Sequence, residues 1–134
     1  MDIYLGIDFG AENIMVSYRD NTNINKVIDL GDQAGKLYMK NYFALDAKSS
    51  TKYYGKNAKD EYRKNNEIIF FSRYKQDLIK EESSLSSYYI RNKITPSMIL
   101  KEMMIYLKGY LDNYLSKNLG SSVKIKKNCC NCSC

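Results

Sequence analysis

The stretch YLGIDFGAENIMV, residues 4–16, is an apolar run that ends in an aspartate, turns through one glycine and resumes as an apolar run. Its first half is short and rich in Ile and Leu, which is typical of a largely buried strand. Its second half continues as NIMVSYRD, in which apolar and polar residues alternate as they do in a strand. The sequence therefore predicts two strands joined by a tight turn that contains Asp8 and Gly10.

This turn has two interpretations. Asp-Phe-Gly between two strands is most often a plain hairpin turn. The same residues can hold a metal nucleotide, because a carboxylate at a strand end can hold hydrated Mg²⁺ and a glycine lets backbone N–H groups approach phosphate oxygens. The chain contains neither the GxxxxGKS/T nor the GxGxxG pattern, so a nucleotide site at this turn must be of another kind.

The composition sets the class of protein. With 134 residues, 44% of them hydrophobic, the chain has the size of one domain and can bury a core. It has no run of about 18 apolar residues and no basic, apolar leader, so we expect a cytoplasmic protein that does not enter a membrane. The net charge of +6 is dispersed along the chain, and we therefore do not expect it to bind nucleic acid.

All four cysteines lie in the final segment CCNCSC. No cysteine upstream can pair with them, which excludes a disulfide framework, and a structural zinc site usually has two Cys or His pairs separated by a loop. We therefore predict an aberrant or disordered tail over residues 128–134, with adventitious metal capture as the alternative. The cysteines are Cys129, Cys130, Cys132 and Cys134.

The rest of the chain predicts a mixture of strands and helices. A third strand follows the first two after a short polar connection, which indicates an antiparallel meander. Further strands are predicted over 37–46 and 51–56, a weak helix over 55–65, a segment from 67 that becomes helical after Ser72, and the start of a strand over 121–127.

The clearest local prediction is a helix over residues 95–118. Thr95 is a suitable N-cap, Pro96 fits the first helical turn, and Gly120 supplies a stop signal. An apolar face at helical spacing is typical of core packing rather than of a cofactor site. We expect this face to contain Ile99, Met103, Tyr106, Tyr110 and Tyr114, flanked by Leu100, Met104, Leu107, Leu111 and Leu115.

Four segments, in order, resemble the DnaK-type seventy-kilodalton heat-shock chaperones. YLGIDFGAENIMVSY is similar to the first phosphate motif of actin-like ATPases and sugar kinases, and YFALDAKSSTKYYGKNAKDE to the chaperones' strand, turn and G..A element. FFSRYKQDLIKE resembles their Phe-Ser-x-Phe-Lys-Arg-Asp-Leu segment, and KITPSMILKEMMIYLKGYLDNYL the helix that begins at TPEEI. The resemblance covers residues 2 to about 127 and implies an α/β fold, namely a truncated first lobe of an actin-like ATPase on a ribonuclease-H-like sheet.

The resemblance implies a site for ATP and Mg²⁺ at the turn. Asp8 falls on the aspartate that holds the metal through water, and Gly10 on the glycine of the phosphate turn. Ala11 and Glu12 fall on the pair of threonines that face the phosphates, and Asn13 completes the phosphate-binding segment.

Lys75 falls on the lysine that helps to position the attacking water and the terminal phosphate. Lys75 and Asp8 are the expected catalytic residues. A lysine suits this role because it is a point charge on a flexible stem. The alternative interpretation is a solvated lysine on a helix.

Two departures from the family pattern predict impaired hydrolysis. Ala11 has no hydroxyl to offer to the phosphate or the metal shell. Glu12 places an acid where an anion should bind, and two like charges 4 Å apart cost about 4 kcal/mol at an effective dielectric constant of about 20.

The second phosphate motif, the second lobe and the peptide-binding domain of the family are not found in this sequence. We therefore expect an ATP-binding lobe that is weak or inactive alone, with client proteins and co-chaperones as partners only of a full-length relative. An open sheet edge also predicts self-association. The alternatives are a non-enzymatic module that binds protein or nucleic acid, and a remnant of an actin-like or sugar-kinase-type phosphotransferase.

Overall fold

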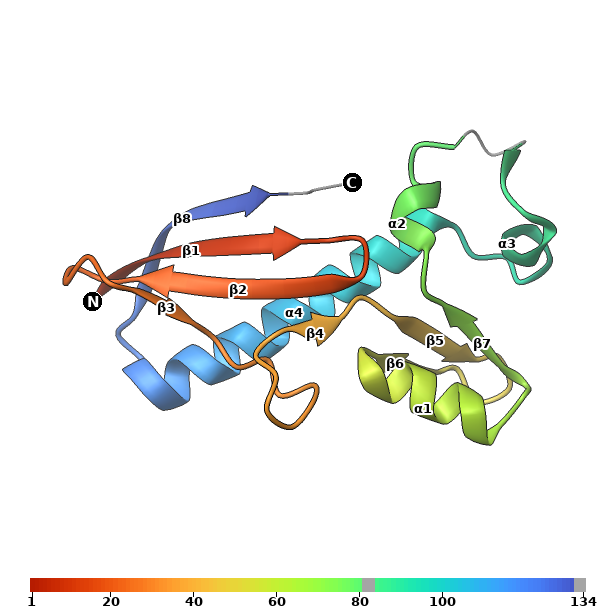
Figure 1. Ribbon diagram of the computed structural model, residues 1–134, viewed down its shortest axis with the longest axis horizontal. Coiled ribbons are helices and arrows are strands. Elements are labelled where there is room, and N and C mark those ends of the chain that lie inside the picture. Colours follow the sequence, from red (N-terminus) through yellow and green to blue (C-terminus); the bar gives the residue numbers. More distant parts are fainter. Residues whose placement is uncertain (81–83, 132–134) are drawn as a thin grey trace.

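The predicted hairpin is present in the computed structural model, which describes residues 1–80 and 84–131 (Figure 1). Strand β1 (Asp2–Phe9) pairs antiparallel with β2 (Asn13–Arg19), and Phe9 is the partner of Ile14 at the closed end. Strand β3 (Asn25–Val27) pairs antiparallel with β2 and confirms the predicted meander.

The first sheet is completed from distant parts of the chain. Strand β8 (Lys124–Asn131) pairs parallel with β1, which gives the strand order β3-β2-β1-β8, and the short β4 (Met39–Lys40) pairs with β2. A parallel pair needs a long crossover, and here the crossover includes a long helix. The chain is thus a mixed α/β protein.

A second sheet lies beside the first and has the order β6-β5-β7. Ala44 of its central strand packs with Ala58 and Ile68 beneath helix α1, while Phe43, on the opposite face, joins the main core. The elements are β5 (Phe43–Asp46), β6 (Thr51–Tyr54), β7 (Ile68–Phe71) and α1 (Lys56–Lys64).

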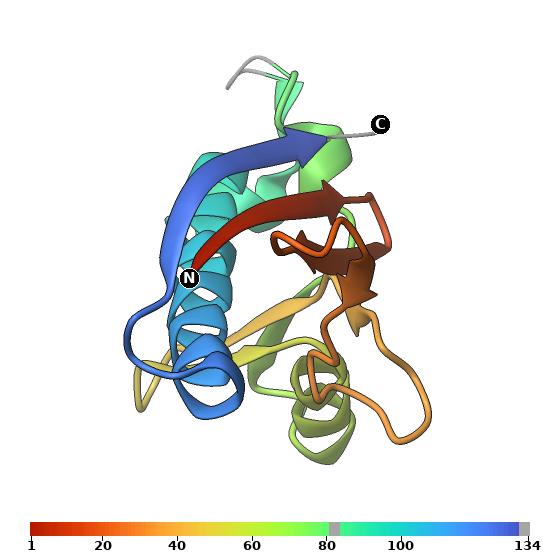
Figure 2. The same ribbon diagram turned by 90° about the vertical axis from the view of Figure 1, so that its left-hand side faces the viewer.

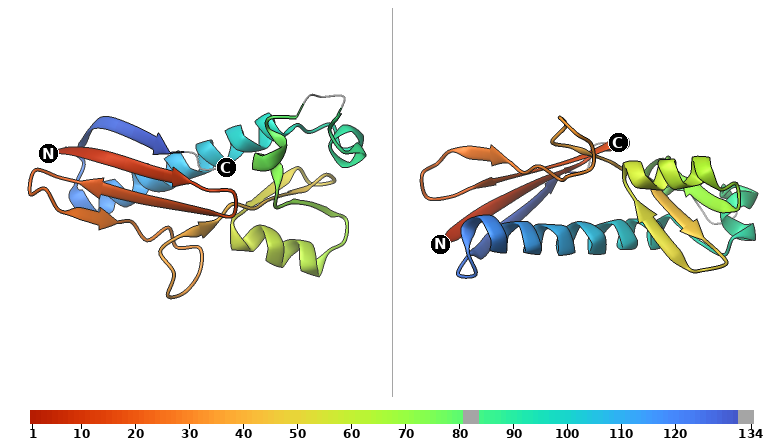
Figure 3. Two further views of the ribbon diagram at one scale, coloured as in Figure 1. Left: turned by 45° about the horizontal axis from the view of Figure 1, so that its top comes forward. Right: turned by 90° about the horizontal axis from the view of Figure 1, so that it is seen from below.

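Helix α4 (Pro96–Leu119) joins the two sheets. It runs along one face of the first sheet and continues past the second, as Figure 3 shows from below and Figure 2 from one end. The side chain of Thr95 accepts a hydrogen bond from the Met98 N–H at 3.2 Å, Pro96 opens the helix, and Gly120 ends it at φ +88°, so the predicted boundaries are confirmed.

The buried row of α4 differs from the predicted one. Tyr106 is 37% exposed, so the prediction that it faces the core was wrong, whereas Tyr110 and Tyr114 are partly buried and pack against the edge of the core. A tyrosine keeps its hydroxyl at a polar boundary, and the leucines beside them pack inward instead. The buried residues of the helix are Pro96, Ile99, Met103, Leu107, Leu111 and Leu115.

Three other predictions need correction. The single strand expected over 37–46 is divided between the two sheets as β4 and β5, because the chain leaves the first sheet at Asn41. The strand expected to stop near Lys127 continues to Asn131, since its pairing with β1 resumes at Lys127 after one register shift and runs on to Asn131. The boundary placed at 127/128 therefore falls inside a strand, and residues 132–134 of the expected tail lie outside the described residues.

Up to residue 80, where the described part of this segment ends, the chain after Ser72 forms one helical turn, α2 (Tyr74–Asp77). A further short helix, α3 (Ser87–Arg91), precedes α4. Among the residues described, no helix is both long and apolar enough to cross a membrane.

Candidate functional site

The β1–β2 turn is a two-residue loop closed by a backbone hydrogen bond. The N–H of Gly10 donates to the Asn13 carbonyl at 2.9 Å, so Ala11 and Glu12 form the loop. A Cβ atom at residue 10 would lie 2.7 Å from the Asn13 carbonyl oxygen, which is too close for a real contact. The hairpin itself therefore requires glycine at this position, whether or not a ligand approaches it.

Two carbonyl groups of the turn, and that of Phe9 just before it, accept hydrogen bonds from the rest of the protein. Asn41, which is fully buried between β4 and β5, donates from its side-chain Nδ2 to the Gly10 carbonyl at 2.9 Å. Its backbone N–H donates to the Glu12 carbonyl at 2.8 Å. The Nζ of Lys75 donates to the carbonyl of Phe9. These three bonds hold one side of the turn against the body of the protein.

The N–H groups of the loop residues have no hydrogen-bond partner in the described part of the chain. Over residues 1–80 and 84–131, the N–H groups of Ala11 and Glu12 make no hydrogen bond. Successive backbone N–H groups without partners at a turn can attract an anion. This arrangement is the main chemical feature of the turn.

Lys75 reaches the turn from α2, 66 residues further along the chain. Its side chain is buried, with an exposed fraction of 9%, so the interpretation as a solvated helix lysine was wrong. A buried ammonium group must be paired or hydrogen-bonded, and the Phe9 carbonyl supplies one partner. The ammonium group of Lys75 thus lies at Phe9, the residue between Asp8 and Gly10.

Tyr74 binds the oxygen of the Asn41 side-chain amide. Its hydroxyl donates to Oδ1 of Asn41, and the side chain is fully buried. Burial raises the pKa of Tyr74 well above its ordinary value of 10.0, so the hydroxyl remains a neutral donor. Consecutive residues of α2 therefore contact the turn, one directly and one through Asn41.

The remaining predicted residues are exposed at the same end of the hairpin. Asp8 lies near the end of β1, between Met15 of β2 and Asn131 of β8 in the ladder. Glu12 and Asn13 are also exposed. The structure thus brings Lys75 to the segment that carries the other predicted site residues.

A pocket of about 460 Å³ opens beside the loop. The turn contributes the walls from Ala11 and Glu12, and the start of α2 contributes Arg73 and Gln76. A cation and an anion therefore both face this space. The lining residues are Ala11, Glu12, Tyr42, Ser72, Arg73 and Gln76.

The side chains at the turn can bind a magnesium ion only if the ion keeps most of its coordinated water molecules. No group of three or more His, Cys, Asp or Glu side chains that could hold a metal occurs in the part of the chain that the structure describes. Asp8 offers one exposed carboxylate, and Mg²⁺ commonly binds through one or two carboxylates, several waters and substrate phosphates. Asp8 is therefore a suitable ligand through water.

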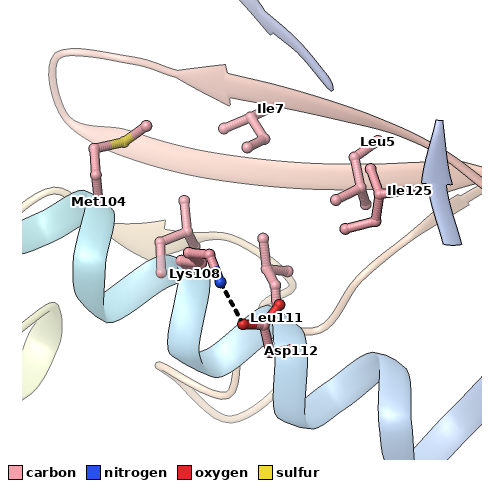
Figure 4. Close-up of a pocket in the computed structure, with 8 residues that line it drawn as sticks. Leu5, Ile7, Met104, Lys108, Leu111, Asp112 and Ile125 are labelled. Carbon is pink, nitrogen blue, oxygen red and sulfur yellow. Dashed lines mark hydrogen bonds and ion pairs between the residues drawn. The ribbon is translucent and has the colours of Figure 1, made fainter. Parts of the chain in front are cut away.

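A second cavity, of about 330 Å³, lies elsewhere, between α4 and the strands β1 and β8 (Figure 4). Leu5, Ile7 and Ile125 point into it from the strands, and α4 forms its other wall. The Nζ of Lys108 and the Oδ2 of Asp112 form an ion pair of 2.7 Å there, so the charged groups that line it among the described residues neutralise each other. It shares no lining residue with the turn.

Sequence reasoning missed Asn41, Tyr74 and Arg73. Asn41 stands in the run LYMKNYFALD, which reads as one strand, and nothing in that run marks its side chain as buried. Arg73 and Tyr74 stand in the segment FFSRYKQDLIKE that carries Lys75, and the resemblance assigned a role to the lysine alone.

The scan against protein-family models and the search of curated proteins found no match to this chain.

Proposed function

We propose that this chain is the ATP-binding lobe of a DnaK-like chaperone ATPase and that its β1–β2 turn binds the phosphates of Mg·ATP. One observation carries the proposal: the carbonyls of Phe9, Gly10 and Glu12 are bonded to the protein, while the N–H groups of Ala11 and Glu12 are left without partners in the described residues. The antiparallel meander and the long helix packed on the sheet support the assignment to an actin-like, ribonuclease-H-like lobe.

The residues of the turn have separate roles in this proposal. The N–H groups of the loop bind phosphate oxygens, and Lys75 supplies positive charge from the buried side. Asp8 holds a water of the Mg²⁺ shell, and the metal neutralises phosphate charge when bound. Because Ala11 offers no hydroxyl and Glu12 brings a negative charge to the pocket, we expect weak binding and little or no hydrolysis.

Calorimetric titration of the folded chain with ATP and Mg²⁺, with and without a chelator, tests the proposal. We expect metal-dependent binding that Asp8→Ala and Lys75→Met each weaken about tenfold or more, because each removes a charged partner of the ligand. Methionine keeps the apolar stem of the buried lysine. Lys108→Met, at an exposed position outside the lining of this pocket, is the matched control and should bind as the wild type does.

Absence of binding by a folded chain would reject the proposal. Equal affinity in the wild type and in both site variants would reject the assignment of the site to this turn.

A further inference from the structure

We propose that Asn41 is a positioning residue of this anion site, which orients the β1–β2 turn so that the N–H of Ala11 faces the phosphate. The inference rests on the proposed function and adds to it the residue that sets the geometry of the site. Asn41 would not touch the ligand. It would act by holding the Gly10 and Glu12 carbonyls on the protein side of the turn.

The amide of Asn41 is suited to this position because it donates and accepts at the same time. The Gly10 carbonyl can only accept, so the nitrogen of the amide must face it, and the oxygen then faces the Tyr74 hydroxyl. A carboxylate at this position would place an acceptor against the carbonyl, and an aliphatic side chain would leave both groups without a partner in a buried site.

Because the peptide group is planar, the hydrogen bond from Asn41 to the Gly10 carbonyl also fixes the direction of the Ala11 N–H. In a trans peptide, the carbonyl of one residue and the N–H of the next point in opposite directions. All peptide bonds of the described chain are trans. Since the Gly10 carbonyl points at Asn41, the N–H of Ala11 must point away from it. The Asn41 side chain that donates to the Gly10 carbonyl therefore also sets the direction of the Ala11 N–H.

Helix α2 couples the two halves of the site. Tyr74 fixes the amide of Asn41, and its neighbour Lys75 bonds the Phe9 carbonyl. The ammonium group and the N–H of Ala11 are thus placed by consecutive residues of one short element. Loss of the Tyr74 hydroxyl should loosen the turn without removing any group that binds the ligand.

The test compares Tyr74→Phe and Asn41→Ala with the matched control Tyr110→Phe, which also loses a tyrosine hydroxyl bonded at 2.8 Å, here to the Asp29 carbonyl. Calorimetry would measure the affinity for Mg·ATP, and the amide signals of Ala11 and Glu12 in the free protein would report the turn by NMR. We expect Tyr74→Phe to bind about fivefold to tenfold more weakly, with both amide signals shifted and the fold retained. Tyr110→Phe should bind as the wild type does.

Wild-type affinity in folded Tyr74→Phe and Asn41→Ala would overturn the inference and leave the proposed function standing. An equal loss in Tyr110→Phe would also overturn it, because the effect would then be one of general stability. If the wild type itself does not bind Mg·ATP, the proposed function fails, and the inference fails with it.

Discussion

At the scale of single residues, the features that first suggest a phosphate site have unequal weight. Gly10 is required by the hairpin, because the Asn13 carbonyl leaves no room for a Cβ atom. The glycine is therefore accounted for without a ligand. A buried lysine that crosses to the turn from a distant helix is not required by any hairpin, and it supports an anion site more strongly.

Glu12 is the residue whose replacement should strengthen binding. Its side chain is exposed and lines the pocket beside the loop, where its charge repels a phosphate. We expect Glu12→Gln to bind Mg·ATP about tenfold more tightly at low salt, with a smaller gain at high salt because ions screen the repulsion. Calorimetric titration at two salt concentrations measures both effects.

The control for this prediction is Asp112→Asn, which removes one negative charge from α4, outside the lining of this pocket. A similar gain in the control would show that net charge, rather than the position of Glu12, determines the affinity. No gain in Glu12→Gln would show that the carboxylate points away from the bound phosphates.

Sequence reasoning could place the backbone of the site but not its supporting side chains. The alternation on both sides of Asp8 and Gly10 is local, so the hairpin and its turn could be predicted. Asn41 acquires its role only because the chain leaves one sheet at that point and enters another, and this is decided by tertiary packing. The same limit applies to Tyr74, because its hydroxyl reaches the turn through its hydrogen bond to Asn41.

At the scale of elements, α4 shows which signals are local. Its ends are set by Thr95, Pro96 and Gly120, whose effects act within one helical turn, and they were predicted correctly. Its buried face depends on what packs against it. The rings of Tyr54 and Tyr106 stack 4.3 Å apart at the flank of the helix, a contact that sequence spacing alone cannot reveal.

The contact between α2 and α3 predicts a loss of stability in alkali. The Tyr89 hydroxyl donates to Oδ2 of Asp77 at 2.6 Å, and burial together with this carboxylate raises the pKa of Tyr89. The folded state therefore holds the phenolic proton more tightly than the unfolded state. This contribution is complete below about pH 10 and decreases as the pH rises toward the folded pKa.

Chemical denaturation from neutral pH to about pH 11 measures this effect. The free energy of unfolding of the wild type should fall over the alkaline part of this range. Tyr89→Phe should be less stable at neutral pH, because it loses the bond to Asp77, and should show a smaller alkaline loss. Parallel pH profiles for the two proteins would contradict the prediction.

At the scale of the whole molecule, the helices and strands can be predicted from the sequence better than their arrangement in space. The mixed α/β class, the meander and the long helix follow from periodicity within short segments. The division into two sheets does not, because β4 and β5 are separated only by Asn41 and Tyr42. The parallel pairing of β8 with β1 joins the two ends of the chain and is likewise invisible to local patterns.

The outer side of β8 predicts self-association. Within the described residues, β8 pairs with β1 alone, so its other edge offers free backbone groups beside the apolar groove that contains Ile125. An open edge next to an apolar surface is a common route to association. Lys124 and Lys126 are exposed on the same strand, and their charges should keep the association weak at low salt.

Sedimentation velocity over a wide range of protein concentrations tests this. The sedimentation coefficient of the wild type should rise with concentration, and more so in added salt, which screens the lysines. Ile125→Lys should abolish the rise, since it adds a further positive charge to the lysines of β8 and removes an apolar wall of the groove. The matched control Ile24→Lys changes an isoleucine that is more exposed, 60% against 41%, but lies before β3, away from this edge. A monomer at every concentration, with a sharp melt that does not depend on concentration, would show that the edge is protected in solution and that the groove does not attract a second copy.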